Sequence, residues 1–329
     1  MFGIGLVRVF SDAHTVHPLT HAEADLTQAE QVRTILKRIR PEVIIHPAGI
    51  PDLDTCEAEP AKAFLVNVHG TRHVVELADE LGAAVAYIST DAVFDGKKQA
   101  PYTESDPAIP PTVYGRTKLR AEQMVRNLPR HWVFRVSVLF GPGKTNFIEK
   151  GLRTIAAGEN YTVAADQIGS ATYTLDAGRK IMEVVDAARY GLYHLSNSGV
   201  CSRLDLARRA AEIAGLDRDK VIGVPSEQMG RLALRLKYAV MEMDAPQASR
   251  SLPASPLAPG TRGVRASIET GTPALTLKFT PAHIVPSNRQ RASSSQRATL
   301  LLISGMTQAS LPTSERHLSC WSSSRKGSM

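Results

Sequence analysis

The stretch Val85-Ala-Tyr-Ile-Ser-Thr90, followed by Asp91, and the stretch Tyr114-Gly-Arg-Thr-Lys118 decide the fold that the sequence predicts. The first is a short apolar, β-rich run that ends in two hydroxyl side chains, Ser89 and Thr90, which is typical of a buried parallel strand. Open α/β sheets bind ligands at the carboxyl edge of such strands. We therefore expect Ser89 and Thr90 at a binding edge.

Tyr114 and Lys118 lie four positions apart in residues 112–128, where apolar residues recur at helical spacing. Both side chains should therefore share one face of a helix. A lysine ammonium beside a phenol lowers the phenol pKa from its usual ~10, so that the tyrosine can pass a proton at neutral pH. With Thr90 or Ser89 holding a substrate oxygen, this set suits a nicotinamide-dependent carbonyl reductase. Outside that context, a Tyr and a Lys one helical turn apart need no function.

Composition limits the classes of protein that fit. The chain has 329 residues, of which 43% are hydrophobic and 22% charged, as in globular proteins of one large or two modest domains. No apolar run approaches the roughly 18 residues of a membrane span, no signal peptide opens the chain, and three scattered cysteines show no metal or disulfide spacing. We expect a cytoplasmic protein that binds neither a membrane nor a metal.

The net charge of +7 is confined to one end of the chain. Residues 244–329 hold ten basic and three acidic residues, which leaves 29 of each in residues 1–243. The basicity of the whole chain therefore does not predict a nucleic-acid partner for its folded body.

The first twenty residues predict a nucleotide fold without its opening strand. Residues 1–10 are typical of an amphipathic helix and residues 15–19 of a strand. A doubly wound fold should begin earlier, with an apolar strand and a glycine loop that cradles a pyrophosphate. Gly3 would fit as the last glycine of that loop, or it is an incidental glycine near a frayed terminus.

The rest of residues 1–243 continues an alternation of strands and helices. The pattern predicts helices at 28–40, 60–81, 112–128, 146–157, 175–189 and 202–216, and strands at 42–49, 85–90, 131–137, 161–164, 191–196 and 221–224. Thr27 and Ser202 are the expected N-caps of two of these helices. The acidic, cysteine-containing segment 52–57 matches no metal motif and is interpreted as a solvated loop or a helix cap.

Four further residues are candidates for contacts with a dinucleotide. Asp25 could approach the adenine, or it is a solvated loop carboxylate. Ala48 and Gly49 end a strand where a cofactor could approach the backbone closely. Asn67 lies in the middle of a mostly apolar helix and needs a partner, either neighbouring backbone or cofactor. Residues 19–21 lack the acidic side chain that grips a ribose 2′-hydroxyl, which favours NADPH over NADH.

The motifs resemble those of the dTDP-4-dehydrorhamnose reductase family of extended short-chain dehydrogenases/reductases. The matching segments are Ile88–Asp91, Val93–Gly96, Pro101-Tyr102, Tyr114-Gly-x-x-Lys118, Arg135-x-Ser137 and Asp166–Tyr173. The resemblance runs from about Gly3 to about Met243. It implies that Thr90, Tyr114 and Lys118 are catalytic and that the enzyme binds NADP or NAD.

The resemblance also implies a Rossmann-like, doubly wound parallel α/β sheet in residues 1–143 and a small substrate-binding lobe in residues 144–243. The implied ligand is a small-molecule nucleotide sugar, and a homodimer is compatible with the family. The residues implied to bind cofactor are Gly3, Asp25, Leu26, Ala48, Gly49, Asn67, Ser89, Tyr114 and Lys118. Those implied to bind substrate are Asp91, Gln167 and Thr172.

Two residues depart from the family pattern at positions that contact the sugar. Members that act on the deoxyhexulose usually carry an aromatic residue where Ala92 stands and a Trp where Val138 stands, so a different or looser sugar pocket is expected.

Two other functions stay open. A sugar-nucleotide epimerase or dehydratase of the same superfamily would use the same Tyr and Lys. A non-catalytic, cofactor-binding subunit resembling the methionine adenosyltransferase β subunit is the other alternative.

Residues 244–329 differ from the rest in composition. Helical and strand periodicity disappears and Ser, Pro, Arg and Gly dominate, which favours a disordered tail. A frame change in the coding sequence near Met243 would account for it. A basic nucleic-acid-binding tail is the functional alternative, but only Phe279 and Trp321 could stack on bases.

Overall fold

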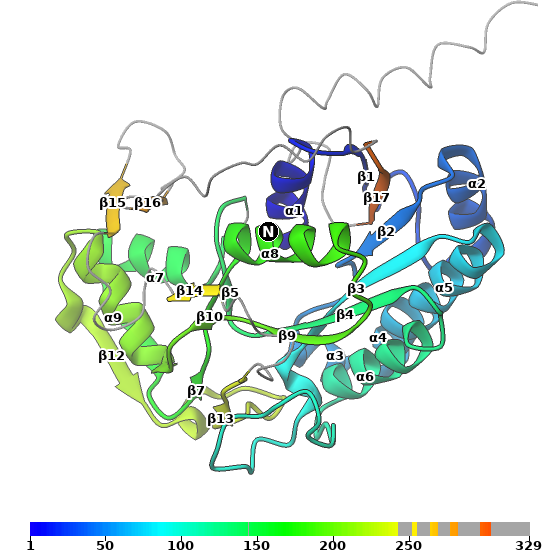
Figure 1. The fold of residues 1–329 in the computed structure, drawn as a ribbon. Helices are drawn as coiled ribbons and strands as arrows, with labels where there is room; N and C mark the ends of the chain where they lie inside the picture. The colour runs from blue at the N-terminus through cyan, green and yellow to red at the C-terminus, as the bar shows by residue number, and fades with distance from the viewer. Residues whose placement is uncertain (144, 243–251, 255–263, 269–276, 282–296, 304–329) are drawn as a thin grey trace, which may run out of the picture.

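A single parallel sheet forms the centre of the protein. The computed structural model describes residues 1–143, 145–242, 252–254, 264–268, 277–281 and 297–303. Within them, six parallel strands follow the order β1-β17-β2-β3-β4-β9 (Figure 1). Their bounds are Thr15–Leu19, Thr299–Ile303, Val43–His46, Ala84–Thr90, His131–Val136 and Gly191–Leu195. The predicted Rossmann-like fold class is confirmed.

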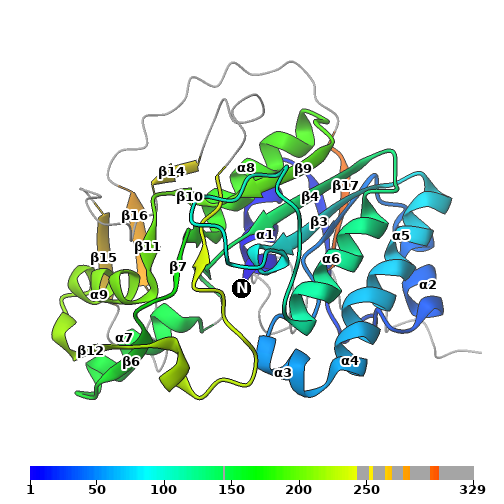
Figure 2. The same ribbon diagram turned by 90° about the horizontal axis from the view of Figure 1, so that it is seen from below.

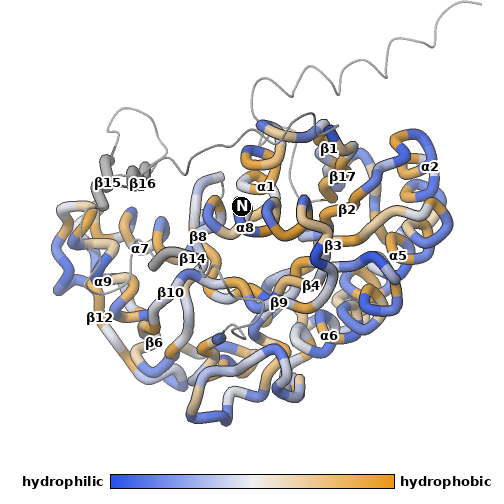
Figure 3. Tube along the Cα trace, in the orientation of Figure 1, coloured by the Kyte–Doolittle hydropathy of each residue, from blue (hydrophilic) through white to orange (hydrophobic). Residues whose placement is uncertain are grey.

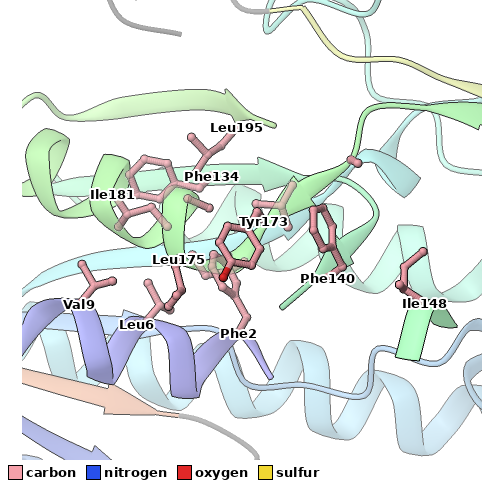
Figure 4. Close-up of a cluster of buried hydrophobic side chains, with 14 of the residues drawn as sticks. Phe2, Leu6, Val9, Phe134, Phe140, Ile148, Tyr173, Leu175, Ile181 and Leu195 are labelled. Atoms are coloured by element: carbon pink, nitrogen blue, oxygen red, sulfur yellow. The ribbon is translucent and has the colours of Figure 1, made fainter. Parts of the chain in front are cut away.

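Helices cover both faces of this sheet, as its apolar strands require. One face carries α1 (Phe2–Phe10) and α8 (Thr174–Asp186), and the other carries α2 (Ala29–Ile39), α5 (Gly70–Leu81) and α6 (Val113–Val125) (Figures 1 and 2). Figure 4 shows side chains of α1 pointing toward Leu175 and Ile181 of α8. The central strands are apolar while polar residues gather on the outer helices (Figure 3). No helix in the described ranges is long and apolar enough to cross a membrane.

The strand β17 corrects one expectation from the sequence, that of disorder in residues 299–303. Residues 299–303 fall in the segment that the sequence assigns to a disordered tail, yet they pair in parallel with β1 on one side and β2 on the other. They therefore occupy the interior position that the sequence leaves empty. The prediction that no strand and glycine loop stand ahead of the first helix is not contradicted, because α1 is the first described element and β17 takes the interior position from a distant part of the chain. β1 lies at the sheet edge, where Pro18 costs no ladder hydrogen bond on its open side.

The second lobe consists of short elements beside the sheet (Figure 2). Its helices are α7 (Phe147–Ala156) and α9 (Arg203–Ile213), and its paired strands are β6 (Tyr161–Ala164) with β12 (Val221–Val224) and β7 (Ile168–Gly169) with β11 (Cys201–Ser202) and β13 (Tyr238–Ala239). The predicted N-cap at Ser202 is confirmed, and Asp205 completes a capping box with it at the start of α9. β9 pairs with β4 in the central sheet and α8 packs on one of its faces, although both follow residue 143. Elements from both sides of the expected domain boundary therefore build this layer.

The remaining described elements are short. They include α3 (Leu53–Ala58), β5 (Leu139–Phe140), β8 (Thr172–Tyr173), β10 (Asn197–Ser198), β14 (Leu252–Ala254), β15 (Val264–Ile268) and β16 (Leu277–Pro281). β5 pairs with β8, β10 with β14, and β15 with β16. Strands β14 to β16 also lie in the segment for which the sequence predicts no regular structure. Other parts of residues 244–329 lie outside the described residues.

Two helix predictions need correction. The expected helix 60–81 is divided into α4 (Pro60–Phe64), a π-helical turn (Leu65–His69) and α5. Thr27 does not cap α2, because its hydroxyl donates to the Asp25 carboxylate and Gln28 takes the N-cap position. The cap interpretation of the acidic segment holds at Asp52, whose carboxylate accepts from the Thr55 amide at the start of α3.

A buried ion pair fixes α6 against β4. Nε of Arg135 donates to Oε1 of Glu122 at 3.1 Å, and Nη2 donates to Oε2 at 2.9 Å. The two side chains are 3% and 0% exposed. Two parallel hydrogen bonds define the orientation as well as the distance between the groups. The pair therefore sets the register of the helix that carries Tyr114 and Lys118.

Replacing Glu122 by Gln should destabilise the fold by about 3–5 kcal/mol, because the Arg135 charge would remain buried without its counterion. Urea unfolding measures this loss. The matched control is Glu80→Gln, which removes an exposed carboxylate paired with Arg33 and Lys37 and should leave the unfolding midpoint nearly unchanged. Equal effects of the two substitutions would show that the buried pair does not hold α6.

Candidate functional site

The carboxyl end of β3 carries the first group of site residues. All seven residues of β3 are buried, so the strand has a fixed position in the sheet. After Thr90 the chain enters a short 3₁₀ helix, Asp91–Val93. The Thr90 hydroxyl donates to Oδ1 of Asp91 at 2.9 Å and accepts from the Ala92 amide at 3.2 Å. These hydrogen bonds hold the Thr90 side chain at the carboxyl edge of the sheet, as the sequence predicts.

The start of α6 brings Tyr114 to Thr90. Thr112 caps the helix by accepting from the Gly115 amide at 3.1 Å. A Cβ added at Gly115 would lie 2.2 Å from the Ala92 carbonyl oxygen, so only glycine allows the helix to approach the end of β3 this closely. The Tyr114 and Thr90 side chains line the same cavities. The structure thus brings together two of the three predicted catalytic residues.

Lys118, one turn further along α6, points back under the same strand. Its Nζ donates to the Ile88 carbonyl at 2.7 Å and lies 4.1 Å from the centre of the Tyr87 ring. The side chain is 5% exposed, and this burial lowers its pKa to about 7. The ammonium therefore has a fixed place beneath the site and loses its charge more readily than an ordinary lysine.

The predicted effect of Lys118 on Tyr114 is not found. Burial raises the pKa of Tyr114 above its usual value, and the neighbouring Thr90 side chain only partly opposes this shift. The prediction of a lowered phenol pKa was wrong because it counted the helical spacing of two side chains and not the desolvation of both. The phenol is therefore protonated at neutral pH.

A cavity of about 680 Å³ runs along the carboxyl edge of the sheet, large enough for a cofactor-sized ligand. Its lining includes Gly3, Ala48, Gly49, Ser89, Thr90, Tyr114 and Lys118, all of which the sequence singled out. Gly3 lies in the first turn of α1, where free amides favour an anion. These features fit a dinucleotide with its phosphates near α1 and its nicotinamide near Tyr114.

Asn67 supports this cavity from behind. Its Oδ1 accepts from the Ile50 amide at 2.7 Å, and its Nδ2 donates to the Ile50 carbonyl at 3.2 Å and to the Thr117 hydroxyl at 3.0 Å. A Cβ at Gly49 would lie 2.8 Å from Oδ1, so Asn67 packs directly against that glycine. Of the two partners that the sequence left open, the structure shows the backbone. Asn67 positions the loop that lines the cavity.

Asp25 and Leu26 lie away from the lining. The Asp25 carboxylate accepts hydrogen bonds from the backbone amide and the hydroxyl of Thr27. The hydrogen bond from the backbone amide is the main reason that the pKa of Asp25 is lowered. Leu26 is buried against Gly70, and its carbonyl oxygen accepts a hydrogen bond from Nδ1 of the His73 ring at 2.8 Å. The structure therefore gives both residues local structural contacts.

A smaller cavity of about 140 Å³ continues toward the second lobe. Asp91 and Gln167, two of the predicted substrate residues, line it together with Thr90 and Tyr114. The Asp91 carboxyl also accepts from the Ser137 hydroxyl, and burial raises its pKa. The third predicted residue, Thr172, is fully buried in β8 and donates to the Leu195 carbonyl at 3.4 Å, so it does not reach the lining.

Arg203 is a site residue that the sequence analysis missed. It is the first residue of α9, and its guanidinium lies 4.7 Å from the centre of the Phe147 ring. It lines both cavities, and its charge interacts with that of Asp91. A positive charge at a helix N-terminus opposes the helix dipole, which was the available signal of a role other than helix stability.

Comparisons with known proteins agree with this geometry. Residues 1–262 match the family model described as "RmlD substrate binding domain". The spore coat polysaccharide biosynthesis protein SpsK of Bacillus subtilis is 33% identical over 241 residues, 73% of this chain and 84% of that protein. The dTDP-4-dehydrorhamnose reductase of Mycolicibacterium smegmatis is 34% identical over 69% of this chain and 70% of its own length.

Solved structures of similar proteins point to the same family. The crystal structure of dTDP-4-dehydrorhamnose reductase from Bacillus anthracis in complex with NADP is 33% identical, with a TM-score of 0.70 over 72% of this chain and 85% of that one. UDP-glucose 4-epimerase from Thermotoga maritima, 17% identical with a TM-score of 0.64, shares the fold. The motifs around Thr90, Tyr114 and Lys118, the sheet and these relatives converge, and the chain belongs to the RmlD substrate binding domain family, that of the dTDP-4-dehydrorhamnose reductases.

Proposed function

We propose that this protein is an NAD(P)H-dependent reductase of a keto group on a nucleotide-linked sugar, with a dTDP-linked 4-keto-6-deoxyhexose as the first substrate to try. The observation that carries the proposal is the convergence of Thr90, Tyr114 and Lys118 on one cavity that the first residues of α1 also line. The relatives named dTDP-4-dehydrorhamnose reductase support the substrate class. NADPH is the favoured cofactor, because the relative from B. anthracis holds NADP.

Tyr114 is the proposed proton donor. Its raised pKa keeps the phenol protonated at neutral pH, which is the form that a general acid needs. The Thr90 hydroxyl lines the same cavity as the phenol and is the proposed group that orients the substrate oxygen. The bound cofactor supplies the hydride. Lys118, fixed on the Ile88 carbonyl, lines the cavity where the cofactor ribose would lie.

The sugar pocket is expected to differ from that of relatives with aromatic contacts. Ala92 and Val138 both line the smaller cavity, where they offer little surface for stacking on a sugar ring. Val138 has a φ of 26°, a strained value for a β-branched residue. Arg203 lies beside this pocket and is the proposed partner of the substrate diphosphate.

Replacing Tyr114 by Phe should lower kcat by about 100- to 10,000-fold, the usual contribution of a positioned general acid, and leave NADPH affinity within a few-fold. The measurement is the oxidation of NADPH with the keto sugar, followed by absorbance. The control is Tyr190→Phe, which changes a tyrosine that is 40% exposed and lies outside both cavities.

An active Tyr114→Phe variant would refute the role of the phenol. Sugar isomerisation without net NADPH oxidation would favour the epimerase alternative. NADPH binding without turnover, together with a stable partner protein, would favour the regulatory-subunit alternative.

Replacing Arg203 by Met should raise KM for the nucleotide sugar by about 10- to 100-fold, because a charged hydrogen-bond donor to the diphosphate is lost, and change kcat much less. Steady-state kinetics measure both constants. Arg72→Met, at an exposed position on α5, is the control and should change neither. A fall in kcat at unchanged KM would contradict diphosphate binding by Arg203.

Lys118 should make stability rise with pH. Its pKa is about 7 in the folded chain and near ~10.4 when unfolded, so above pH 7 the unfolded chain binds more protons. The penalty for burying the charge is complete below pH 7 and is relieved above it. From about pH 7 to about pH 9 the free energy of unfolding should gain about 2 kcal/mol from this residue.

Urea unfolding of the wild type and of Lys118→Met at both pH values isolates this contribution. The variant should lose that gain, whatever its absolute stability. Equal pH dependence in both proteins would show that Lys118 keeps an ordinary pKa in the fold.

A further inference from the structure

The strand β17 fills an interior slot of the sheet from the far end of the sequence. Its five residues align one by one with Thr15–Leu19 of β1, and Leu300–Leu302 align with Val43–Ile45 of β2. At its entry, the Thr15 amide donates to the Ala298 carbonyl at 3.1 Å and the Glu42 amide donates to the Thr299 carbonyl at 2.9 Å. The Thr299 amide donates to the Glu42 carboxylate at 3.1 Å.

Both faces of β17 contribute to the core. Leu300 and Leu302 belong to the cluster under α1 and α8, and Leu301 and Ile303 belong to the cluster under α2 and α5. These four side chains are 0–2% exposed. An edge strand or a surface contact needs apolar residues on one face only, whereas an interior parallel strand needs them on both. Residues 300–303 therefore have the composition that this position demands.

β17 lies next to elements that line the candidate cofactor cavity. Parallel strands end at one edge of a sheet, so the carboxyl end of β17 lies beside the end of β2, which leads to Ala48 and Gly49. α1 contacts both β1 and β17, and its first residues line the same cavity. Without β17, β1 and β2 would lose ladder partners and stand two strand spacings apart, about 9.6 Å.

We propose that the cofactor site is assembled from both ends of the chain: β17 is a docking strand, supplied by the segment after residue 296, that the sheet requires in order to bind the dinucleotide. Only the identity of the dinucleotide rests on the proposed function. Because the cofactor binds the docked form, it also holds the strand in place. Cofactor at 100 times its Kd should lower the undocked population about 100-fold.

The first experiment cuts the full-length chain after folding, at a site for a sequence-specific protease placed within residues 282–296. The fragment that contains β17 should remain with the rest of the protein through size-exclusion chromatography. Saturating NADPH should slow its exchange with an excess of labelled synthetic peptide of residues 297–303. A fragment that separates while the larger part keeps its Tm and its NADPH affinity would overturn the proposal.

A pair of leucine substitutions in the uncut chain tests the same proposal. Leu301→Asp places a charge in the core and should lower Tm and weaken NADPH binding at least tenfold. Leu232→Asp changes a leucine that is 64% exposed and should alter neither. Unchanged Tm and affinity in Leu301→Asp would overturn the proposal. If Leu301→Asp does not fold, the cut chain decides.

Co-elution and Tm can both be measured in the absence of cofactor. A cut protein that holds its strand but, like the uncut chain, binds no NADPH would therefore contradict the proposed function and the cofactor requirement, whereas docking itself would stand.

Discussion

The burial of β17 on both faces is the constraint on which the rest of the structure depends. Leu300 and Leu302 belong to the hydrophobic cluster on one face of the sheet, and Leu301 and Ile303 belong to the cluster on the other face. A single strand therefore packs against the helices on both faces. The backbone of β17 also bridges β1 and β2, which would otherwise have no common partner. Because parallel strands end at one edge, this central strand also sets the edge at which the cavity opens.

The site itself is held by hydrogen bonds to backbone rather than by contacts among catalytic side chains. Lys118 is fixed on the Ile88 carbonyl, Asn67 holds the loop of Ile50, and Thr90 is bonded to the Ala92 amide. The buried pair of Glu122 and Arg135 then aligns α6 with β4. Rigid elements therefore define the position of Tyr114, which is the preorganisation that proton transfer requires.

Local pattern in the sequence predicted most of the main elements and several residues of the cavity lining, because helical spacing and strand ends determine which side chains share an edge. It missed β17, since this strand holds only four consecutive apolar residues, Leu300–Ile303, in a segment rich in Ser, Pro and Arg, and its partners are more than 250 positions away. It also misjudged the pKa of Tyr114, because desolvation is a property of the packed structure. Arg203 was missed because its neighbours come from other elements.

The most direct test of the account follows the hydride. The full-length protein is incubated with a dTDP-linked 4-keto-6-deoxyhexose and NADPH that carries deuterium at the transferable position, and the sugar and the cofactor are analysed by mass spectrometry. The account predicts one deuterium in the reduced sugar for each NADPH oxidised. A sugar that returns isomerised or unchanged, with the cofactor still reduced, would contradict the claim that this cleft is the active site of a reductase.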